Sequence, residues 1–97
     1  MKDRPDGFIP YKTTAVFTAE TVPQALTRSH RTKAGVWGRI DVVEGSLELI
    51  RFDHNGAAVA HETIRAGESA LVAPGEPHAV TLSATAAFSV TFLRQSE

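Results

Sequence analysis

The stretch SLELIRFDHNGAAVAHETI, residues 46–64, decides the fold class. Two runs rich in Leu, Ile, Val and Ala flank Asn55-Gly56, and these two residue types most readily adopt the positive φ of a tight hairpin turn. We therefore predict antiparallel strands at residues 46–52 and 57–64. Apolar residues occur on both faces of the first run, which indicates either burial on both sides or a β-bulge that shifts the phase.

Similar runs continue on both sides of this hairpin. β-Favouring segments recur about every ten residues between clusters of Gly, Pro, Asp, Asn and Ser, which is typical of a sandwich or a small barrel. The last segment alternates Phe and Val with Ser and Thr, so one of its faces is buried. The further predicted strands are residues 36–43, 70–73, 78–82 and 87–93. Residues 11–17 fit an edge strand, and residues 21–26 fit a short helical turn or an arm.

The size and composition of the chain indicate one globular domain. It has 97 residues, of which 42% are hydrophobic and 22% charged, and these proportions do not favour disorder. We assign residues 1–10, which contain Pro5, Gly7 and Pro10, to a flexible tail or a strand lent to a partner. Residues 11–97 form the domain. Because so small a core gains stability from assembly, we expect oligomerisation.

Charge and residue content exclude several classes of function. Ten Lys and Arg against eleven Asp and Glu give a formal charge of -1, so we do not expect a nucleic-acid partner. No apolar run approaches the roughly 18 residues of a membrane span, and the start has no apolar signal core. We therefore expect a cytoplasmic protein with no membrane partner. The chain has no Cys, which excludes disulfides, thiolate metal sites and cysteine nucleophiles.

Four histidines are the main candidates for chemistry. His54 lies in the predicted hairpin turn and His61 in a strand, and both fit exposed positions. His30 and His78 lie at the ends of strand-like segments, where two imidazoles can hold Zn²⁺, Ni²⁺ or Fe²⁺ if a third ligand or water completes the shell. Alternatively, both rings bond to the backbone and close the barrel. The possible third ligands are Glu76, Asp41 and Glu44.

The turn before His78 resembles the second cupin motif, in which proline and glycine precede a histidine. Gly67, Pro74, Gly75 and His78 match that motif. One residue is missing between Pro74 and Gly75, and Leu82 stands where the motif has asparagine. The resemblance implies that the turn directs the imidazole of His78 into the mouth of a barrel.

The first cupin motif is not preserved. It carries H-x-H, then a glutamate, then a glycine. When Gly45 is aligned with that glycine, the ligand positions fall near Ala34 and Gly38, where the chain has no ligand. His30 is the nearest candidate, so the usual four-ligand site is depleted.

A second resemblance covers nearly the whole chain from Tyr11. The stretch HRTKAGVWGRIDVVEGSL, residues 30–47, with the later Pro77-His78 and a closing strand at residues 88–94, resembles the small cupin-like family represented by YeaR and by the N-terminal domain of some TehB tellurite-resistance proteins. The resemblance implies a double-stranded β-helix, which is a small jelly-roll barrel. It also implies a homodimer associated with tellurite resistance or with nitrogen-oxide and nitrate stress, with no settled enzymatic activity.

Some members of that family carry this domain fused to a methyltransferase that uses S-adenosylmethionine. The 97 residues contain no glycine-rich loop that follows a strand and opens a helix. They also leave no room for a nucleotide-binding fold. We therefore expect that this chain is not a methyltransferase by itself.

Residues 28–39 carry four basic side chains and no acidic one. If they flank the pocket, their field favours a small oxyanion such as tellurite, nitrite or a carboxylate. Arg39 is the best placed, because it lies on a strand and can bind two oxygens at once. Lys33 adds charge and Trp37 can wall the pocket. The alternatives are a solvated basic edge and a tryptophan that belongs to the core.

Three functions remain open. The leading hypothesis is a cupin-like, stress-associated domain that binds a small anion or a metal-bound small molecule in the barrel mouth. The second is a metal-dependent enzyme, such as a dioxygenase or an isomerase, with His78 as a metal ligand. The third is a dimeric partner module for a separate methyltransferase.

Overall fold

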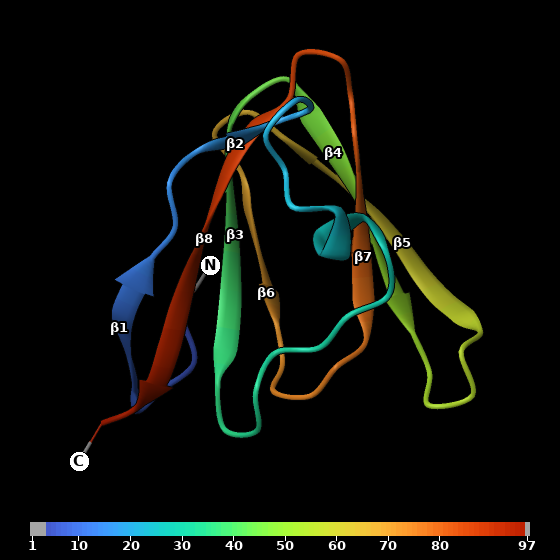
Figure 1. The fold of residues 1–97 in the computed structure, drawn as a ribbon. Helices are drawn as coiled ribbons and strands as arrows, with labels where there is room; N and C mark the ends of the chain where they lie inside the picture. Colours follow the sequence, from blue (N-terminus) through green and yellow to red (C-terminus); the bar gives the residue numbers. More distant parts are fainter. Residues whose placement is uncertain (1–3, 97) are drawn as a thin grey trace.

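The computed structural model describes residues 4–96, which form eight β-strands, one short 3₁₀ helix and no α-helix (Figure 1). All paired strands run antiparallel. No helix in this range has the length and apolarity needed to cross a membrane. The elements are β1 (Phe8–Thr13), β2 (Phe17–Thr18), η1 (Gln24–Thr27), β3 (Trp37–Glu44), β4 (Ser46–Phe52), β5 (Ala58–Arg65), β6 (Ser69–Val72), β7 (His78–Leu82) and β8 (Ala87–Gln95).

The strands form two sheets that share one core. The larger sheet has the order β1-β8-β3-β6, with β2 also paired to β8, and the smaller has the order β5-β4-β7. Each large apolar side chain buried between them contributes about 1.5–3 kcal/mol to stability. The all-β prediction is confirmed, whereas the predicted barrel is not closed by hydrogen bonds in residues 4–96. The core side chains are Ile40, Val42, Ala70, Val72 and Phe88 from the larger sheet and Leu47, Leu49, Ile64 and Val80 from the smaller.

The hairpin that decided the fold class forms at the predicted place, because β4 pairs with β5 around Asn55-Gly56. Of the two central turn residues, only Gly56 has positive φ, at 88°. The Asp53 carboxylate supports the turn by accepting hydrogen bonds of 2.9 Å from two of its backbone amides. A register shift between Arg51 and Phe52 marks the bulge that makes the alternation in β4 irregular.

The N-terminal part differs from the prediction. β1 begins at Phe8, so residues 8–10 of the predicted tail pair with β8 of their own chain. The predicted edge strand at residues 11–17 is divided between β1 and β2. Nearly all side chains of β1 are exposed, and a strand without a buried face has no apolar alternation to reveal it. The rest of the predicted tail includes residues 1–3, which lie outside the described residues.

Candidate functional site

His30 and His78, which we call the histidine pair, face each other across an isolated antiparallel bridge. The backbone amide of each residue donates to the carbonyl of the other at 2.9 Å. Their ring centroids lie 4.1 Å apart, with 58° between the ring planes. His78 opens β7 and is only 4% exposed, whereas His30 is half-buried. The structure therefore brings together the two histidines singled out from the sequence.

Backbone carbonyls fix the orientation of both rings. Nδ1 of His30 lies 2.9 Å from the Arg28 carbonyl, and Nδ1 of His78 lies 2.8 Å from the Glu76 carbonyl. A carbonyl only accepts, so each Nδ1 carries a proton and, in a neutral ring, Nε2 keeps its lone pair. Within residues 4–96 neither Nε2 takes part in a hydrogen bond. The pair thus presents two nitrogen acceptors that can bind a metal ion or a hydrogen-bond donor.

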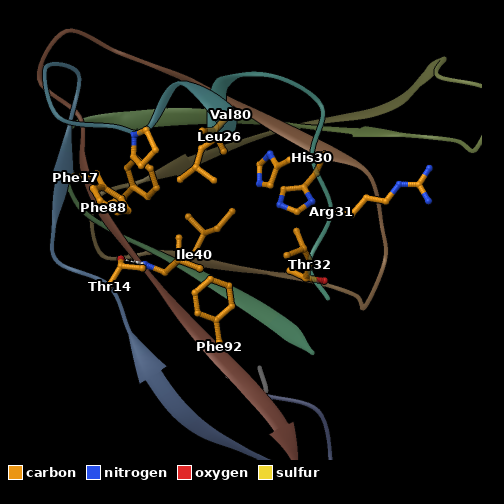
Figure 2. Close-up of a pocket in the computed structure, with 14 residues that line it drawn as sticks. Thr14, Phe17, Leu26, His30, Arg31, Thr32, Ile40, Val80, Phe88 and Phe92 are labelled. Carbon is orange, nitrogen blue, oxygen red and sulfur yellow. Dashed lines mark hydrogen bonds between the residues drawn. The ribbon is translucent and has the colours of Figure 1, made fainter. Parts of the chain in front are cut away.

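The pair borders a cavity of about 300 Å³ between the two sheets. Figure 2 shows His30 on one side of this space and Phe17 and Phe88 on the other. His78, whose ring lies against that of His30, lines the same space. Arg31 also lines the rim, with its guanidinium directed away from the interior. Apolar side chains make up most of the remaining wall. The cavity therefore has one polar end, formed by the histidine pair.

Burial lowers the pKa of His78 below its ordinary value of 6.5, since desolvation disfavours the charged ring. The bond to the Glu76 carbonyl opposes this shift, while the nearby charges of His30 and Arg51 add to it. His78 is therefore neutral at pH 7, which is the form that binds metals.

This lowered pKa predicts that stability falls in mild acid. The unfolded chain takes up a proton at His78 near pH 6.5, whereas the folded chain resists it, so the free energy of unfolding decreases as the pH falls through 6.5 and levels off below the folded-state pKa. Urea unfolding between about pH 7.5 and 5 measures the effect. His78→Asn should lose less stability over this range than the wild type or His54→Asn. Identical profiles in all three proteins would contradict the assignment.

Arg51 supports the site and was not identified from the sequence. Its guanidinium donates to the Glu76 carboxylate at 2.8 Å, to the Leu71 carbonyl at 2.9 Å and to the Glu62 carboxylate at 3.3 Å. Glu76 precedes His78 by two residues, so these bonds anchor the loop that leads into the site. The alternation in β4 could have identified it. Leu47 and Leu49 face inward, and Arg51 is the next residue on the same face of the strand.

Arg51→Met should lower the free energy of unfolding by about 2–3 kcal/mol, because it leaves the half-buried Glu76 carboxylate without its charged partner. Arg51→Lys should lose less, since an ammonium can keep one of the three bonds. Chemical denaturation measures both effects. Arg65→Met is the control, because Arg65 is exposed and its side chain makes no hydrogen bond or ion pair in residues 4–96. Equal losses at the two positions would show that Arg51 anchors nothing.

The other predicted binding residues lie away from the cavity. Arg39 and Trp37 alternate along β3 with the core residue Ile40, so they occupy the opposite face of the sheet. There the Arg39 Nε donates to Asp41 at 3.1 Å, and the Trp37 ring contacts Phe8 edge-on at 6.2 Å. Lys33 is exposed in the loop before β3. None of these three predicted residues lines the cavity.

None of the candidate third metal ligands lines the cavity beside the pair. Glu76 is bound by Arg51, Asp41 by Arg39, and Glu44 is exposed at the end of β3. In residues 4–96 no group of three or more His, Cys, Asp or Glu side chains is arranged to hold a metal ion. A metal ion at the pair would therefore need water or a ligand to complete its shell.

Comparisons with solved structures agree with this architecture. The crystal structure of TehB from Haemophilus influenzae matches with a TM-score of 0.86 and 27% identity, over 93% of this chain and 32% of that one. A protein from Escherichia coli K12 matches with a TM-score of 0.88 and 22% identity, over 100% of this chain and 91% of that one. The second likeness shows the fold alone.

Sequence comparisons point to the same group of proteins. Two curated relatives from strains of Haemophilus influenzae, each named a probable S-adenosyl-L-methionine-dependent methyltransferase TehB, are 36% identical over 50 residues. That match covers 52% of this chain and 18% of each relative, so the chain corresponds to a small part of those proteins. A family model described as the TehB-like domain matches residues 12–90. This chain therefore belongs to the TehB-like domain family.

Proposed function

We propose that this chain is a ligand-binding domain in which the Nε2 atoms of His30 and His78 hold one divalent metal ion. The observation that carries the proposal is that both Nδ1 atoms donate to backbone carbonyls. Metal-binding histidines commonly have such a partner, which fixes the tautomer and leaves Nε2 for the metal. Neutral imidazole suits Zn²⁺, Ni²⁺ and Fe²⁺. The open coordination positions would then bind a small molecule or anion.

The chemistry of the pair favours a metal-bound anion over a free one. With its Nδ1–H bonded to a backbone carbonyl, a neutral ring offers only the acceptor Nε2, and a free oxyanion such as nitrite or tellurite also offers acceptors. Binding it directly would require protonation of a ring, which burial opposes at His78. A divalent cation supplies the missing positive charge.

The composition of the cavity favours binding over turnover. No carboxylate or amine side chain lines it beside the pair. The hydroxyls of Thr14 and Thr32 are both engaged with the backbone. A general acid or base separate from the metal ligands is thus missing from the described lining, and proton transfer commonly needs one. A metal-dependent enzyme remains the alternative reading of the same site.

We also propose that the fold is an opened version of the cupin jelly roll. The orders β1-β8-β3-β6 and β5-β4-β7 fit its two interlocked Greek keys. The His30 bridge adds the segment before β3 to the edge of β7, at the position of a fourth strand. On this interpretation the metal would lie at the open edge of the roll.

Titration calorimetry of metal-free protein with Zn²⁺, Ni²⁺ and, without oxygen, Fe²⁺ tests the metal site. We expect one ion per chain for at least one of these metals. An anomalous scattering map of the loaded crystal should then place a peak between the two imidazoles. The proposal fails if none of the three ions binds, or if the peak lies elsewhere.

A second candidate function is that of a dimeric partner module for a separate methyltransferase. The observation that favours it is that a similar domain fills only 32% of the H. influenzae TehB chain, whereas the same fold fills 91% of the E. coli protein. Such a domain therefore exists both within a longer chain and nearly alone. Light scattering should show a mass of twice 10.4 kDa and co-elution with a TehB-type methyltransferase from the same cell. A monomer that elutes separately would refute this function.

A further inference from the structure

The cavity beyond the histidine pair is an apolar compartment with walls from both sheets and η1. Phe17 and Phe88 form its far end, with ring centroids 5.7 Å apart, and Leu26 of η1 faces Ile40 and Phe92 across the space (Figure 2). The remaining apolar lining residues are Pro23, Val72, Val80 and Val90.

The polar groups of this compartment are satisfied by the protein itself. The Thr14 hydroxyl donates to the next carbonyl at 2.8 Å and accepts from the Val90 amide at 3.0 Å. The Thr32 hydroxyl bonds in the same two ways to the loop at residues 73–75. Since the Arg31 guanidinium is directed outward, the histidine pair provides the polar atoms that remain for a guest.

A site of this kind is poor for water and good for an organic molecule. An ordered buried water needs two to four polar partners, and the far end of the cavity offers none to it. Apolar contact, in contrast, gains about 25 cal/mol for each Å² removed from water. Ligand pockets in proteins typically combine such walls with a few placed polar groups.

We infer that the cavity binds a small amphipathic molecule, in which an aromatic or similar hydrocarbon body fills the apolar compartment and one polar group, such as a phenolic hydroxyl, meets the histidine pair. The role given to the polar group rests on the proposed function, whereas the apolar compartment stands on its own lining. The polar group donates to a bare Nε2 in the metal-free protein and binds the cation in the metal-loaded one.

The volume of the cavity limits the size of the hydrocarbon body that it can hold. An apolar cavity of about 150 Å³ is enough to hold benzene, and this cavity has about 300 Å³. Two fused rings therefore fit, whereas nitrite or tellurite would leave most of the apolar wall without contact. The compartment thus selects for the hydrocarbon body rather than for a bare oxyanion.

Calorimetric titration with 2-naphthol tests this inference in the metal-free and the zinc-loaded protein. We expect saturable binding in both forms. The methyl ether, 2-methoxynaphthalene, keeps the body but has no proton to donate, so it should bind about tenfold more weakly to the metal-free protein. Equal affinity for the two compounds would overturn the role of the polar group.

Two variants fill the compartment from opposite walls. Val90→Phe from β8 and Leu26→Phe from η1 should each weaken 2-naphthol at least about tenfold, because the added ring occupies the space of the guest. Val59→Phe is the matched control, since Val59 is 62% exposed on β5. In the wild type, 2-naphthol should shift the methyl resonances of Ile40 and not those of Val59. This measurement decides the question even if a filled variant does not fold.

The outcomes separate this inference from the proposed metal site. Zinc binding that is unchanged in Val90→Phe while 2-naphthol binding is lost supports the compartment. Naphthol binding without any metal binding would retain the compartment and reject the metal site. No shift at Ile40, or unchanged 2-naphthol affinity in both folded filled variants, would overturn the inference.

Discussion

His78→Ala should weaken the binding of Zn²⁺ or Ni²⁺ by at least about 100-fold, and His30→Ala should do the same. Losing a partner that only orients a ligand commonly costs 10- to 100-fold in metal affinity, so losing one of two protein ligands should cost no less. The neighbouring ring cannot compensate, because its Nδ1 is held by a backbone carbonyl and only Nε2 is available. Calorimetry on each variant measures the loss.

The other two histidines are the controls for this experiment. His54 is exposed in the β4–β5 turn, and His61 is exposed on β5, where its Nδ1 pairs with Glu48 at 2.6 Å. Replacing either by alanine should leave the metal affinity within about twofold of the wild type, because surface changes away from a site have small effects. If His61→Ala removed the binding and His78→Ala did not, the metal would bind at the surface and the proposed function would be wrong.

Gly45→Ala should reduce the free energy of unfolding by about 2–5 kcal/mol, the largest effect on stability that we expect from adding one methyl group. Gly45 joins β3 to β4 with φ of +63°. A Cβ there would lie 2.8 Å from the Ala86 amide nitrogen and equally close to the Thr85 carbonyl carbon. Both neighbours are backbone atoms, so the clash cannot be relieved by rotating a side chain.

Gly56→Ala separates the cost of positive φ from the cost of the steric clash. Gly56 also has positive φ, at +88°, but nothing lies within 4 Å of a Cβ built there. This variant should therefore lose only the cost of the left-handed conformation, about 1–2 kcal/mol. Urea unfolding of both variants provides the comparison. A loss at position 56 as large as that at position 45 would show that steric contact adds nothing.

The sequence by itself determined the strands with a buried face and the hairpin at Asn55-Gly56. Both are local properties: a side-chain period of two reveals a half-buried strand, and turn residues reveal the φ that the turn needs. Two of the predicted strands, residues 46–52 and 78–82, match the structure at both ends. Residues 8–10 of β1 were missed, because the pairing of this strand depends on backbone bonds to a strand about 80 residues away and its exposed side chains carry no pattern.

The sequence also selected both members of the histidine pair, because His78 opens a predicted strand and His30 lies at the end of a strand-like segment. Only the tertiary structure decided that their rings lie 4.1 Å apart. It likewise decided which face of β3 points inward. Because side chains alternate along a strand, Trp37 and Arg39 lie on one face of β3 and Ile40 lies on the other, yet both faces carry large apolar residues. Which face is buried depends on what the opposite sheet presents. The smaller sheet faces Ile40 and Val42 with its own leucines and valine, which leaves Arg39 outside and encloses the cavity beside the histidines.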